Sequence, residues 1–267
     1  MAVYKVGFIG AGNIASAIFG GITHSGYIKP ENVFVFDTDS SKTEKFSVKG
    51  ATELPDIKSV IKKCDFVFLT VKPQIYPIVL EDIKNSDSDA CYIDVAAGIS
   101  IDYVKKSLGY NAPVVRAMPN TPLMCGMGST ALVKREPVTD EQFAFVKGCF
   151  DSCGISAVVD ESQINAITAV SGSAPAYILK MAAEFIRFAV VSGIDPEDSK
   201  KLVLQVFAGS AKLATENENS IDQLIKNVTS PNGTTEAGLK SLTENRFEDI
   251  INCCLCKTVL RAEELSK

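Results

Sequence analysis

The first 160 residues alternate between short apolar runs and longer stretches in which apolar and polar residues recur at helical spacing. The runs are rich in valine, isoleucine and phenylalanine, which is typical of buried strands. Strands that alternate with helices indicate a doubly wound, mainly parallel sheet. We expect strands at residues 5–9, 33–36, 66–70, 91–95 and 114–118, with 129–133 and 155–158 extending the same sheet.

Beyond residue 160 the strand pattern stops, and we expect helices at 176–192, 196–215, 221–228 and 247–265. Several are apolar nearly all round and carry small residues such as Ala208, Gly209 and Ala211, so they need cover on more than one side. The pattern predicts an α/β chain. We expect an N-terminal Rossmann-type, doubly wound domain at 1–160 and an all-helical domain at 161–267 that shares its core with a second copy.

The composition is that of a globular protein, with 267 residues, 46% hydrophobic residues and a net charge of -5. That charge gives no broad attraction to nucleic acid or to an anionic membrane, so neither is an expected partner. No signal-peptide pattern precedes the first strand, and no apolar run reaches the roughly 20 residues of a membrane span, so we expect a cytoplasmic protein. The eight cysteines lack the histidines and spacing of a metal site and predict reduced thiols.

A glycine-rich turn follows the first predicted strand immediately and opens a helix. Its sequence, Gly-Ala-Gly-Asn-Ile-Ala, has the form that binds a dinucleotide. The first glycine permits a tight turn, the second lets the backbone approach a pyrophosphate, and the final alanine allows close helix packing. The expected cofactor contacts in this turn are Gly10, Ala11, Gly12, Asn13 and Ile14.

Asp37 ends the second predicted strand, where a carboxylate meets the adenosine ribose in such domains. It would accept hydrogen bonds from the ribose hydroxyls and repel a 2′-phosphate, which favours NADH. Ser40, Ser41 and Lys42 follow closely and would bind that phosphate if Asp37 turned aside. NADH and NADPH therefore both stay open as the cofactor.

Three more loops follow predicted strands at the edge of the sheet where ligands bind in this architecture. Their sequences are VKPQ at 71–74, AAG at 96–98 and MPNTP at 118–122. Small and turn-forming residues in all three predict a cradle for the nicotinamide half of the cofactor. The expected contacts are Val71, Lys72, Pro73, Ala97, Gly98 and Asn120.

A candidate substrate site lies between two predicted helices, at residues 230–235, which read Ser-Pro-Asn-Gly-Thr-Thr. Proline and Asn-Gly predict a turn, and Thr234 and Thr235 are expected to cap the helix that follows. Backbone N–H groups and hydroxyls at the positive end of a helix suit a small carboxylate. An ordinary turn between helices is the alternative.

The sequence offers little for histidine chemistry. Its one histidine, His24, falls near the end of the first predicted helix. A Ser-His-Asp or Cys-His arrangement, or a histidine metal site, therefore has little support. The reaction should need no strong histidine acid.

With these motifs in view, the chain resembles the pyrroline-5-carboxylate reductase family nearly end to end. The matching segments are GAGNIA at 10–15, VKPQ at 71–74, AAG at 96–98, MPNTP at 118–122, SGSAPAY at 171–177 and NVTSPNGTTEAGL at 227–239. The last is the most specific. The resemblance implies NAD(P)H-dependent reduction of the C=N bond of 1-pyrroline-5-carboxylate, which gives L-proline.

The resemblance also implies roles for individual residues. Thr235 corresponds to the family threonine whose hydroxyl hydrogen-bonds the substrate ring nitrogen, and the backbone around it holds the substrate carboxylate. Asn227 aligns with a residue near the nicotinamide. The family's C-terminal helices interlock in a homodimer, and dimers often assemble further, commonly to decamers. The substrate-side residues that the resemblance implies are Glu161, Glu218, Ser230, Gly233, Thr234 and Thr235.

Three positions depart from the family pattern. Asn232 replaces the first glycine of Ser-Pro-Gly-Gly. Asparagine can adopt the backbone conformation of that glycine because it tolerates left-handed geometry. Ala174 replaces a frequent glycine, and Asp37 stands where many relatives have a small polar residue that accepts the NADP phosphate. Two other functions stay open: a two-domain imine or hydroxyacid reductase with another substrate, and a non-catalytic NAD(P)H-binding sensor.

Overall fold

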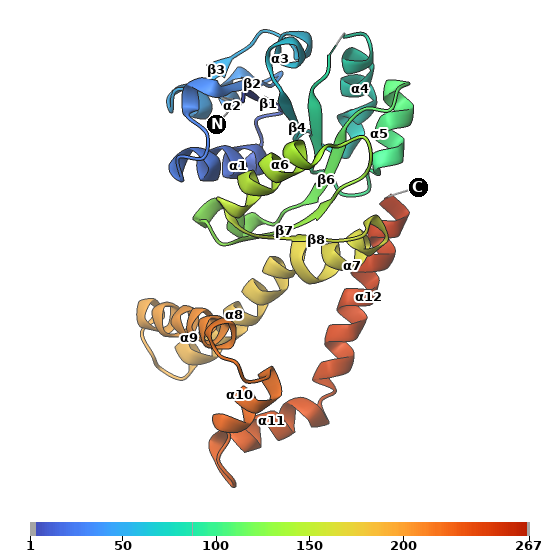
Figure 1. The fold of residues 1–267 in the computed structure, drawn as a ribbon. Helices are drawn as coiled ribbons and strands as arrows, with labels where there is room; N and C mark the ends of the chain where they lie inside the picture. The colour runs from blue at the N-terminus through green and yellow to red at the C-terminus, as the bar shows by residue number, and fades with distance from the viewer. Residues whose placement is uncertain (1–3, 87, 266–267) are drawn as a thin grey trace. The chain divides into compact units, whose positions relative to one another are not determined.

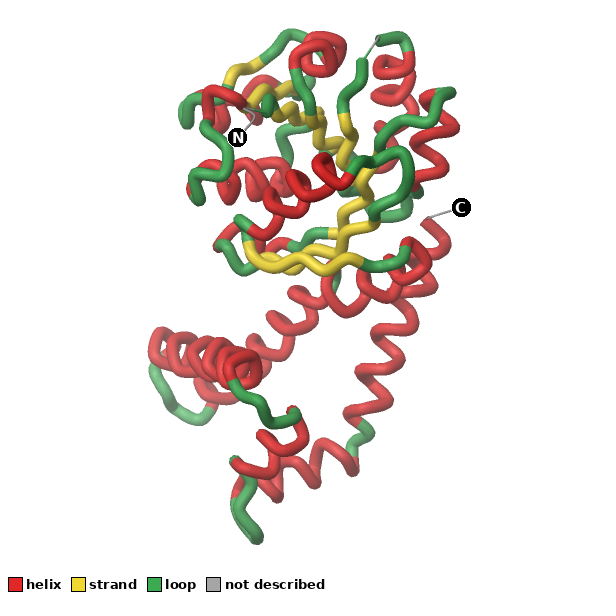
Figure 2. The backbone as a smooth tube through the Cα atoms, viewed as in Figure 1, coloured by secondary structure: helices red, strands yellow, loops and turns green. Residues whose placement is uncertain are grey.

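The computed structural model describes residues 4–86 and 88–265 and contains an eight-stranded sheet (Figures 1 and 2). Its order is β3-β2-β1-β4-β5-β6-β7-β8, and all neighbouring pairs are parallel except β6 with β7. The doubly wound, mainly parallel sheet is therefore confirmed. Strand β3 was not predicted, because two residues are too short to show a pattern. The strands are β1 Val6–Ile9, β2 Val33–Phe36, β3 Thr52–Glu53, β4 Phe66–Leu69, β5 Cys91–Asp94, β6 Val114–Met118, β7 Gly128–Val133 and β8 Gly154–Val158.

The strand register brings several loops to one edge of the sheet. Ile9 pairs with Phe36 on one side and with Leu69 on the other, and Leu69 pairs with Asp94. The carboxyl ends of β1, β2, β4 and β5 are thus in line. After β1 the chain forms β2 on one side of β1, and it later forms β4 on the other side of β1. Doubly wound sheets bind their ligands at the point where the strand order reverses in this way.

Helices cover both faces of the sheet (Figure 1). One apolar core contains Phe8, Phe19 and Phe68, and the other contains Leu69 and Val104. The first face packs against α1 (Asn13–His24), α2 (Ser40–Ser47) and α6 (Asp140–Asp151). The second packs against α3 (Ile57–Lys63), α4 (Tyr76–Lys84) and α5 (Ile101–Leu108). Short 3-10 helices lie at Pro30–Asn32, Pro73–Ile75, Thr121–Cys125 and Glu161–Gln163.

Local sequence signals explain where several of these helices begin and end. The Thr139 hydroxyl oxygen accepts a hydrogen bond from the Gln142 N–H, and the Gln142 Oε1 accepts one from the Thr139 N–H, which fixes the start of α6. Ser100 caps α5 in the same way through the Tyr103 N–H. Gly109 ends α5 in the left-handed conformation at φ 78°, which glycine adopts without steric cost.

The described residues after β8 form helices, as the sequence predicts. The helices of the segment up to Gly172 were not predicted individually. They are the four-residue α7 (Ile164–Ile167) and a π-helical turn at Thr168–Gly172, and each is too short for a helical pattern to recur. The longer helices match their predicted positions within a few residues. They are α8 Ala174–Val191, α9 Pro196–Glu216, α10 Ile221–Asn227, α11 Thr234–Glu244 and α12 Phe247–Leu265.

Packing divides the chain into two compact units. The first comprises residues 1–173 and 258–267, and the second comprises residues 174–257. The sequence pattern places a boundary at 160/161, where the strands end. The two divisions differ because the short helices up to Ser173 and the last turns of α12 belong to the compact unit of the sheet.

The second unit leaves large apolar side chains exposed in the single chain. Phe188 on α8 is 77% exposed, and Leu202 and Val206 on α9 are 61% and 60% exposed. Large exposed apolar side chains on two helices that pack together are typical of a protein–protein interface. In the part of the chain that the structure describes, no helix is long and apolar enough to cross a membrane.

Candidate active site

The glycine-rich turn between β1 and α1 has a fixed geometry. Gly10 has φ +97°, and a Cβ at this position would lie 2.8 Å from the Thr70 carbonyl oxygen, so both conformation and space require glycine. The Gly10 N–H donates to the Phe36 carbonyl at 2.8 Å, and the Thr70 hydroxyl donates to the Gly10 carbonyl at 2.7 Å. Thr70 was not predicted as a site residue, although it follows β4 as a polar side chain at the ligand edge.

Gly12 leaves open space at the start of α1. A Cβ at this position would meet no atom within 4 Å, in contrast to Gly10. No side chain caps the N-terminus of α1, so the first N–H groups keep their hydrogen-bonding capacity. An open approach to the positive end of a helix fits a pyrophosphate, as the glycine pattern predicts.

Gly12→Val should therefore impair cofactor binding without impairing the fold. The branched side chain would occupy the space that a pyrophosphate needs, so affinity for the dinucleotide should fall at least tenfold, about 1.4 kcal/mol. Fluorescence titration with NADH and NADPH measures the loss, and thermal unfolding checks the fold. Gly20→Val is the matched control, because Gly20 on α1 also faces open space. Gly26→Val is unsuitable because Gly26 has φ +73° and a valine there would be strained. A folded Gly12→Val protein with unchanged affinity would contradict the assignment.

Asp37 is tied to the glycine turn. Its Oδ2 accepts the Ala11 N–H at 2.8 Å, and its Oδ1 accepts the Asp39 N–H at 2.9 Å. Lys42 lies 3.7 Å from Asp37 and 3.5 Å from Asp39, so the one cation of this cluster already faces two carboxylates. This arrangement places negative charge at the end of β2, next to the turn.

The loops after β5 and β6 are held by contacts within the chain. Gly98 has φ +81°, and a Cβ there would lie 2.5 Å from the Leu265 carbonyl oxygen at the end of α12, so this position also requires glycine. The Asn120 amide donates to the Ser171 carbonyl at 3.3 Å, and its Oδ1 accepts the Ser129 N–H at 2.9 Å. The Asn120 carboxamide thus joins β7 to the π-helical turn.

Glu161 forms an ion-pair network within the first unit. Its Oε1 accepts from the Arg116 guanidinium at 3.1 Å and from the Ile101 N–H at 2.9 Å, and its Oε2 lies 3.0 Å from Arg135. Arg135 also pairs with Asp102 at 3.0 Å, and these hydrogen bonds raise the pKa of Arg135. Arg116 was not predicted as a site residue, because an arginine inside an apolar strand gives no sign of its partner.

The loop at 230–235 opens α11 in the second unit. The Gly233 N–H donates to the Ser230 carbonyl at 3.0 Å, which closes the predicted turn, and Asn232 adopts φ +58°, as expected for an asparagine in place of glycine. The prediction that Thr234 and Thr235 cap the helix is wrong. Gly233 is the N-cap, and both threonines lie in the first turn with exposed side chains.

The first turn of α11 keeps some of its N–H groups available. The Asn232 N–H is already bonded to the Glu236 carboxylate at 2.8 Å. The helix N-terminus thus already attracts a carboxylate from its own chain, and the next N–H groups have no intrahelical acceptor. Of the other implied residues, Asn227 ends α10 and accepts a hydrogen bond from Gln223 at 2.8 Å, whereas Glu218 is exposed between α9 and α10.

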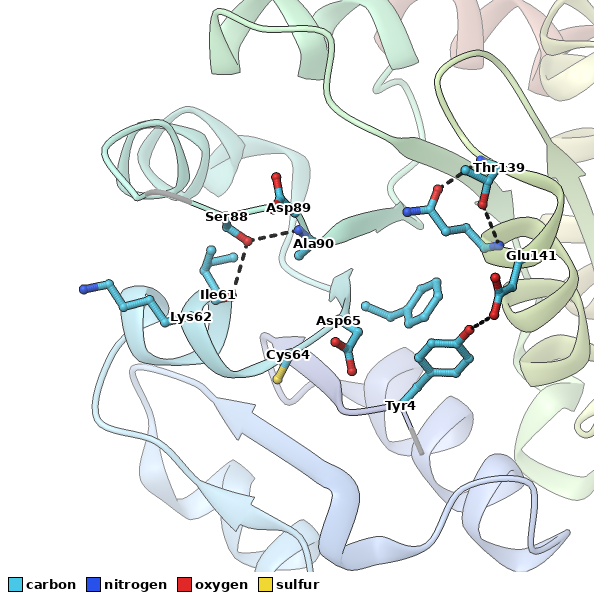
Figure 3. Close-up of a pocket in the computed structure, with 12 residues that line it drawn as sticks. Tyr4, Ile61, Lys62, Cys64, Asp65, Ser88, Asp89, Ala90, Thr139 and Glu141 are labelled. Atoms are coloured by element: carbon cyan, nitrogen blue, oxygen red, sulfur yellow. Dashed lines mark hydrogen bonds between the residues drawn. The ribbon is translucent and has the colours of Figure 1, made fainter. Parts of the chain in front are cut away.

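A cavity of about 660 Å³ lies at the other edge of the sheet (Figure 3). Its lining includes Tyr4, Phe66 and Ala90, which lie at or just before the amino ends of β1, β4 and β5. Tyr4 donates to Glu141 across it. Because ligands of doubly wound sheets bind at the carboxyl ends of the strands, this cavity is not the candidate cofactor site.

Two family models match the chain. The one described as pyrroline-5-carboxylate reductase dimerisation matches residues 161–265. The one described as NADP oxidoreductase, coenzyme F420-dependent, matches residues 5–98. The two matches lie in the C-terminal and N-terminal parts of the chain, and residues 99–160 fall between them.

Similar proteins cover the whole chain. The pyrroline-5-carboxylate reductase of Escherichia coli is 32% identical over 98% of this chain and 98% of its own length. Pyrroline-5-carboxylate reductase 2 of Bacillus subtilis is 30% identical over 98% and 95%. The Plasmodium falciparum pyrroline carboxylate reductase with NADP bound superposes with TM-score 0.92 at 30% identity, over 100% of both chains. The Coxiella burnetii pyrroline-5-carboxylate reductase gives TM-score 0.92 at 34% identity, also over 100% of both.

Proposed function

Because this chain belongs to the pyrroline-5-carboxylate reductase family, we propose that its glycine-rich turn and its 230–235 loop bind the cofactor and the substrate of one reaction. The protein is an NAD(P)H-dependent oxidoreductase that reduces the C=N bond of 1-pyrroline-5-carboxylate to give L-proline. When bound, NAD(P)H supplies the hydride. The residues of the chain bind the two molecules and orient them.

The cofactor residues that we propose lie at the carboxyl edge of the sheet. Gly10, Ala11 and Gly12, with the first N–H groups of α1 at Asn13 and Ile14, would hold the pyrophosphate, and Asp37 would meet the adenosine ribose. The loops that follow β4, β5 and β6 would hold the nicotinamide half through Val71, Lys72, Pro73, Ala97, Gly98 and Asn120, with Asn227 near the ring. The open space beside Gly12 is the observation that supports this proposal most directly.

The substrate would bind at the start of α11. N–H groups of the first turn, at Thr234 and Thr235, would hold its carboxylate together with the backbone of Gly233 and the Ser230 hydroxyl. The Thr235 hydroxyl would keep the ring nitrogen oriented while the imine becomes an amine. A protonated cyclic imine is already an electrophile at carbon, so the chain does not have to supply a strong acid. Glu161 and Glu218 stay predicted substrate-side residues.

We propose that the active form is a homodimer formed through the C-terminal helices. The match of residues 161–265 to the dimerisation model and the exposed apolar side chains of α8 and α9 support it. Assembly of dimers into a decamer stays a prediction.

A cytoplasmic location is also part of the proposal. Cys64, Cys91, Cys149 and Cys153 are buried thiols that form no disulfide in the structure. Unpaired cysteines are typical of reducing compartments.

A spectrophotometric assay of NAD(P)H consumption with 1-pyrroline-5-carboxylate tests the substrate directly. Consumption that depends on this imine, with L-proline as the product, is the expected result. Binding of NAD(P)H without consumption would favour the sensor, and turnover of another imine or hydroxyacid in its place would favour the related reductase.

We further propose that the carboxylate of Asp37 disfavours NADPH. Asp37→Asn removes the charge and keeps an oxygen that can accept the Ala11 N–H, so kcat/KM with NADPH relative to NADH should rise about fivefold. Steady-state kinetics with both cofactors measure the ratio. Asp39→Asn removes a neighbouring charge that also faces Lys42 and should change the ratio less. An unchanged ratio of kcat/KM values in Asp37→Asn would show that Asp37 stabilises the glycine-rich turn and does not affect the choice of cofactor.

A further inference from the structure

A buried pair of side chains, Tyr76 and Asp94, joins two of the proposed cofactor loops. Tyr76 opens α4, after the loop that follows β4, and Asp94 is the last residue of β5, before the loop at 95–98. Both residues are 0% exposed. The Tyr76 hydroxyl lies 2.5 Å from Asp94 Oδ1 and 3.0 Å from the Leu69 carbonyl oxygen, and Asp94 Oδ1 accepts the Ala96 N–H at 3.0 Å.

The hydrogen bonds of this pair cannot all form when Asp94 is ionised. A phenol carries one proton, and both the Leu69 carbonyl and an ionised carboxylate only accept. Both contacts of Tyr76 are separate two-centre hydrogen bonds only if Asp94 is protonated and donates to the phenol oxygen, which leaves the phenol proton for Leu69. With Asp94 ionised, Tyr76 donates to Asp94, and Leu69 loses this donor.

The surroundings of Asp94 keep a substantial fraction of it protonated near neutral pH. Burial is the main cause that raises the pKa of Asp94 to about 7, against the hydrogen bonds from Tyr76 and Ala96. Arg116, its register partner on β6, lowers this pKa, and Glu161 raises it. Arg116 is itself paired with Glu161, whose other oxygen faces Arg135.

Two polar atoms of this region have no partner among the described residues. They are Asp94 Oδ2 and Arg116 Nε. A buried carboxylate oxygen without a donor is costly when it is charged and much less so when the group is neutral. The oxygen without a donor and the single proton of Tyr76 lead to the same conclusion: ionisation of Asp94 destabilises the structure around it.

We propose that Asp94 and Tyr76 form a protonatable positioning pair that sets the geometry of the two loops beside the nicotinamide. With Asp94 protonated, the chain of hydrogen bonds runs from Asp94 through Tyr76 to Leu69 and closes the loop after β4 against the loop after β5. Loss of the proton to solvent breaks the bond to Leu69, loosens the first loop and weakens cofactor binding. The inference rests on the proposed cofactor site.

The dissociation constant of NADH, measured by fluorescence titration without substrate, tests it. NADH is the suitable probe because the 2′-phosphate of NADPH titrates in the same range, at about pH 6. Between about pH 6 and pH 8.5, on either side of the Asp94 pKa, the wild-type constant should rise about fivefold, the contribution of one hydrogen bond. Asp94→Asn should remove this pH dependence. Tyr76→Phe should bind at the low pH about as weakly as the wild type does at the high pH.

Tyr92→Phe is the matched control. Tyr92 is a buried tyrosine on the same strand as Asp94, and its hydroxyl lies 3.4 Å from that of Tyr110, away from the cofactor loops. This variant should keep the wild-type pH profile.

A pH-independent wild type, or an Asp94→Asn protein with the wild-type profile, would overturn the inference. If Asp94→Asn does not fold, Tyr76→Phe tests the inference by itself. Wild-type affinity of this variant for NADH at the low pH would also overturn the inference. Failure of the cofactor site itself would appear differently, as an unchanged NADH affinity in Gly12→Val.

Discussion

Thr235→Ala should lower kcat/KM for 1-pyrroline-5-carboxylate roughly 5-fold to 150-fold, the equivalent of about 1 to 3 kcal/mol for one positioned hydrogen bond. The substitution removes the hydroxyl that we place at the ring nitrogen and leaves the backbone N–H groups of the first turn of α11. Binding of the carboxylate should therefore largely survive. Affinity for NAD(P)H should change little, which steady-state kinetics and a separate cofactor titration can establish.

Two variants show whether the hydroxyl itself is responsible. Thr235→Ser keeps the hydroxyl and should recover most of the activity. Thr243→Ala removes an exposed threonine near the other end of the same helix and should behave as wild type. Wild-type kcat/KM in Thr235→Ala would remove Thr235 from the site, and an equal loss of cofactor affinity would place it at the cofactor.

Glu161→Ala should lower the free energy of unfolding by roughly 3 kcal/mol, because it leaves a buried arginine without its charge partner. Arg116 is 5% exposed, and Glu161 also accepts the Ile101 N–H at the start of α5 and pairs with Arg135. Glu161→Gln should lose less, since it keeps an acceptor oxygen. Urea unfolding at one fixed protein concentration measures the loss, because an oligomer's stability depends on concentration.

The control for Glu161 is an exposed ion pair. Glu184 contacts Lys180 at 2.8 Å but is 45% exposed, so Glu184→Ala should change stability far less than Glu161→Ala does. A loss in Glu161→Ala no larger than that in Glu184→Ala would mean that water reaches Arg116 once Glu161 is gone. A stable Glu161→Ala protein that has lost substrate affinity would instead support the substrate role that the family resemblance implies.

The sequence determined the order of the strands and long helices. Period-two and helical patterns depend on which face of an element is buried, so they are visible in the chain itself, and the strands and long helices were confirmed within a few residues. The turn at Gly10 and the left-handed Asn232 were equally predictable, because their backbone conformations depend on the residue type. Short elements such as β3 and α7 were missed because each contains only about one period, so no pattern can recur within it.

Only the tertiary structure decided which side chains meet. Tyr76, Asp94, Arg116 and Glu161 come from four elements, and strand register and burial bring them together. The cap of α11 was likewise decided by the turn: the bond from Gly233 to Ser230 places Gly233 at the N-cap and carries both threonines into the helix. Hydrogen bonds and charge pairs act through space over a few ångströms, whereas a sequence pattern records only spacing along the chain. The partners of a buried polar group are therefore fixed by the fold.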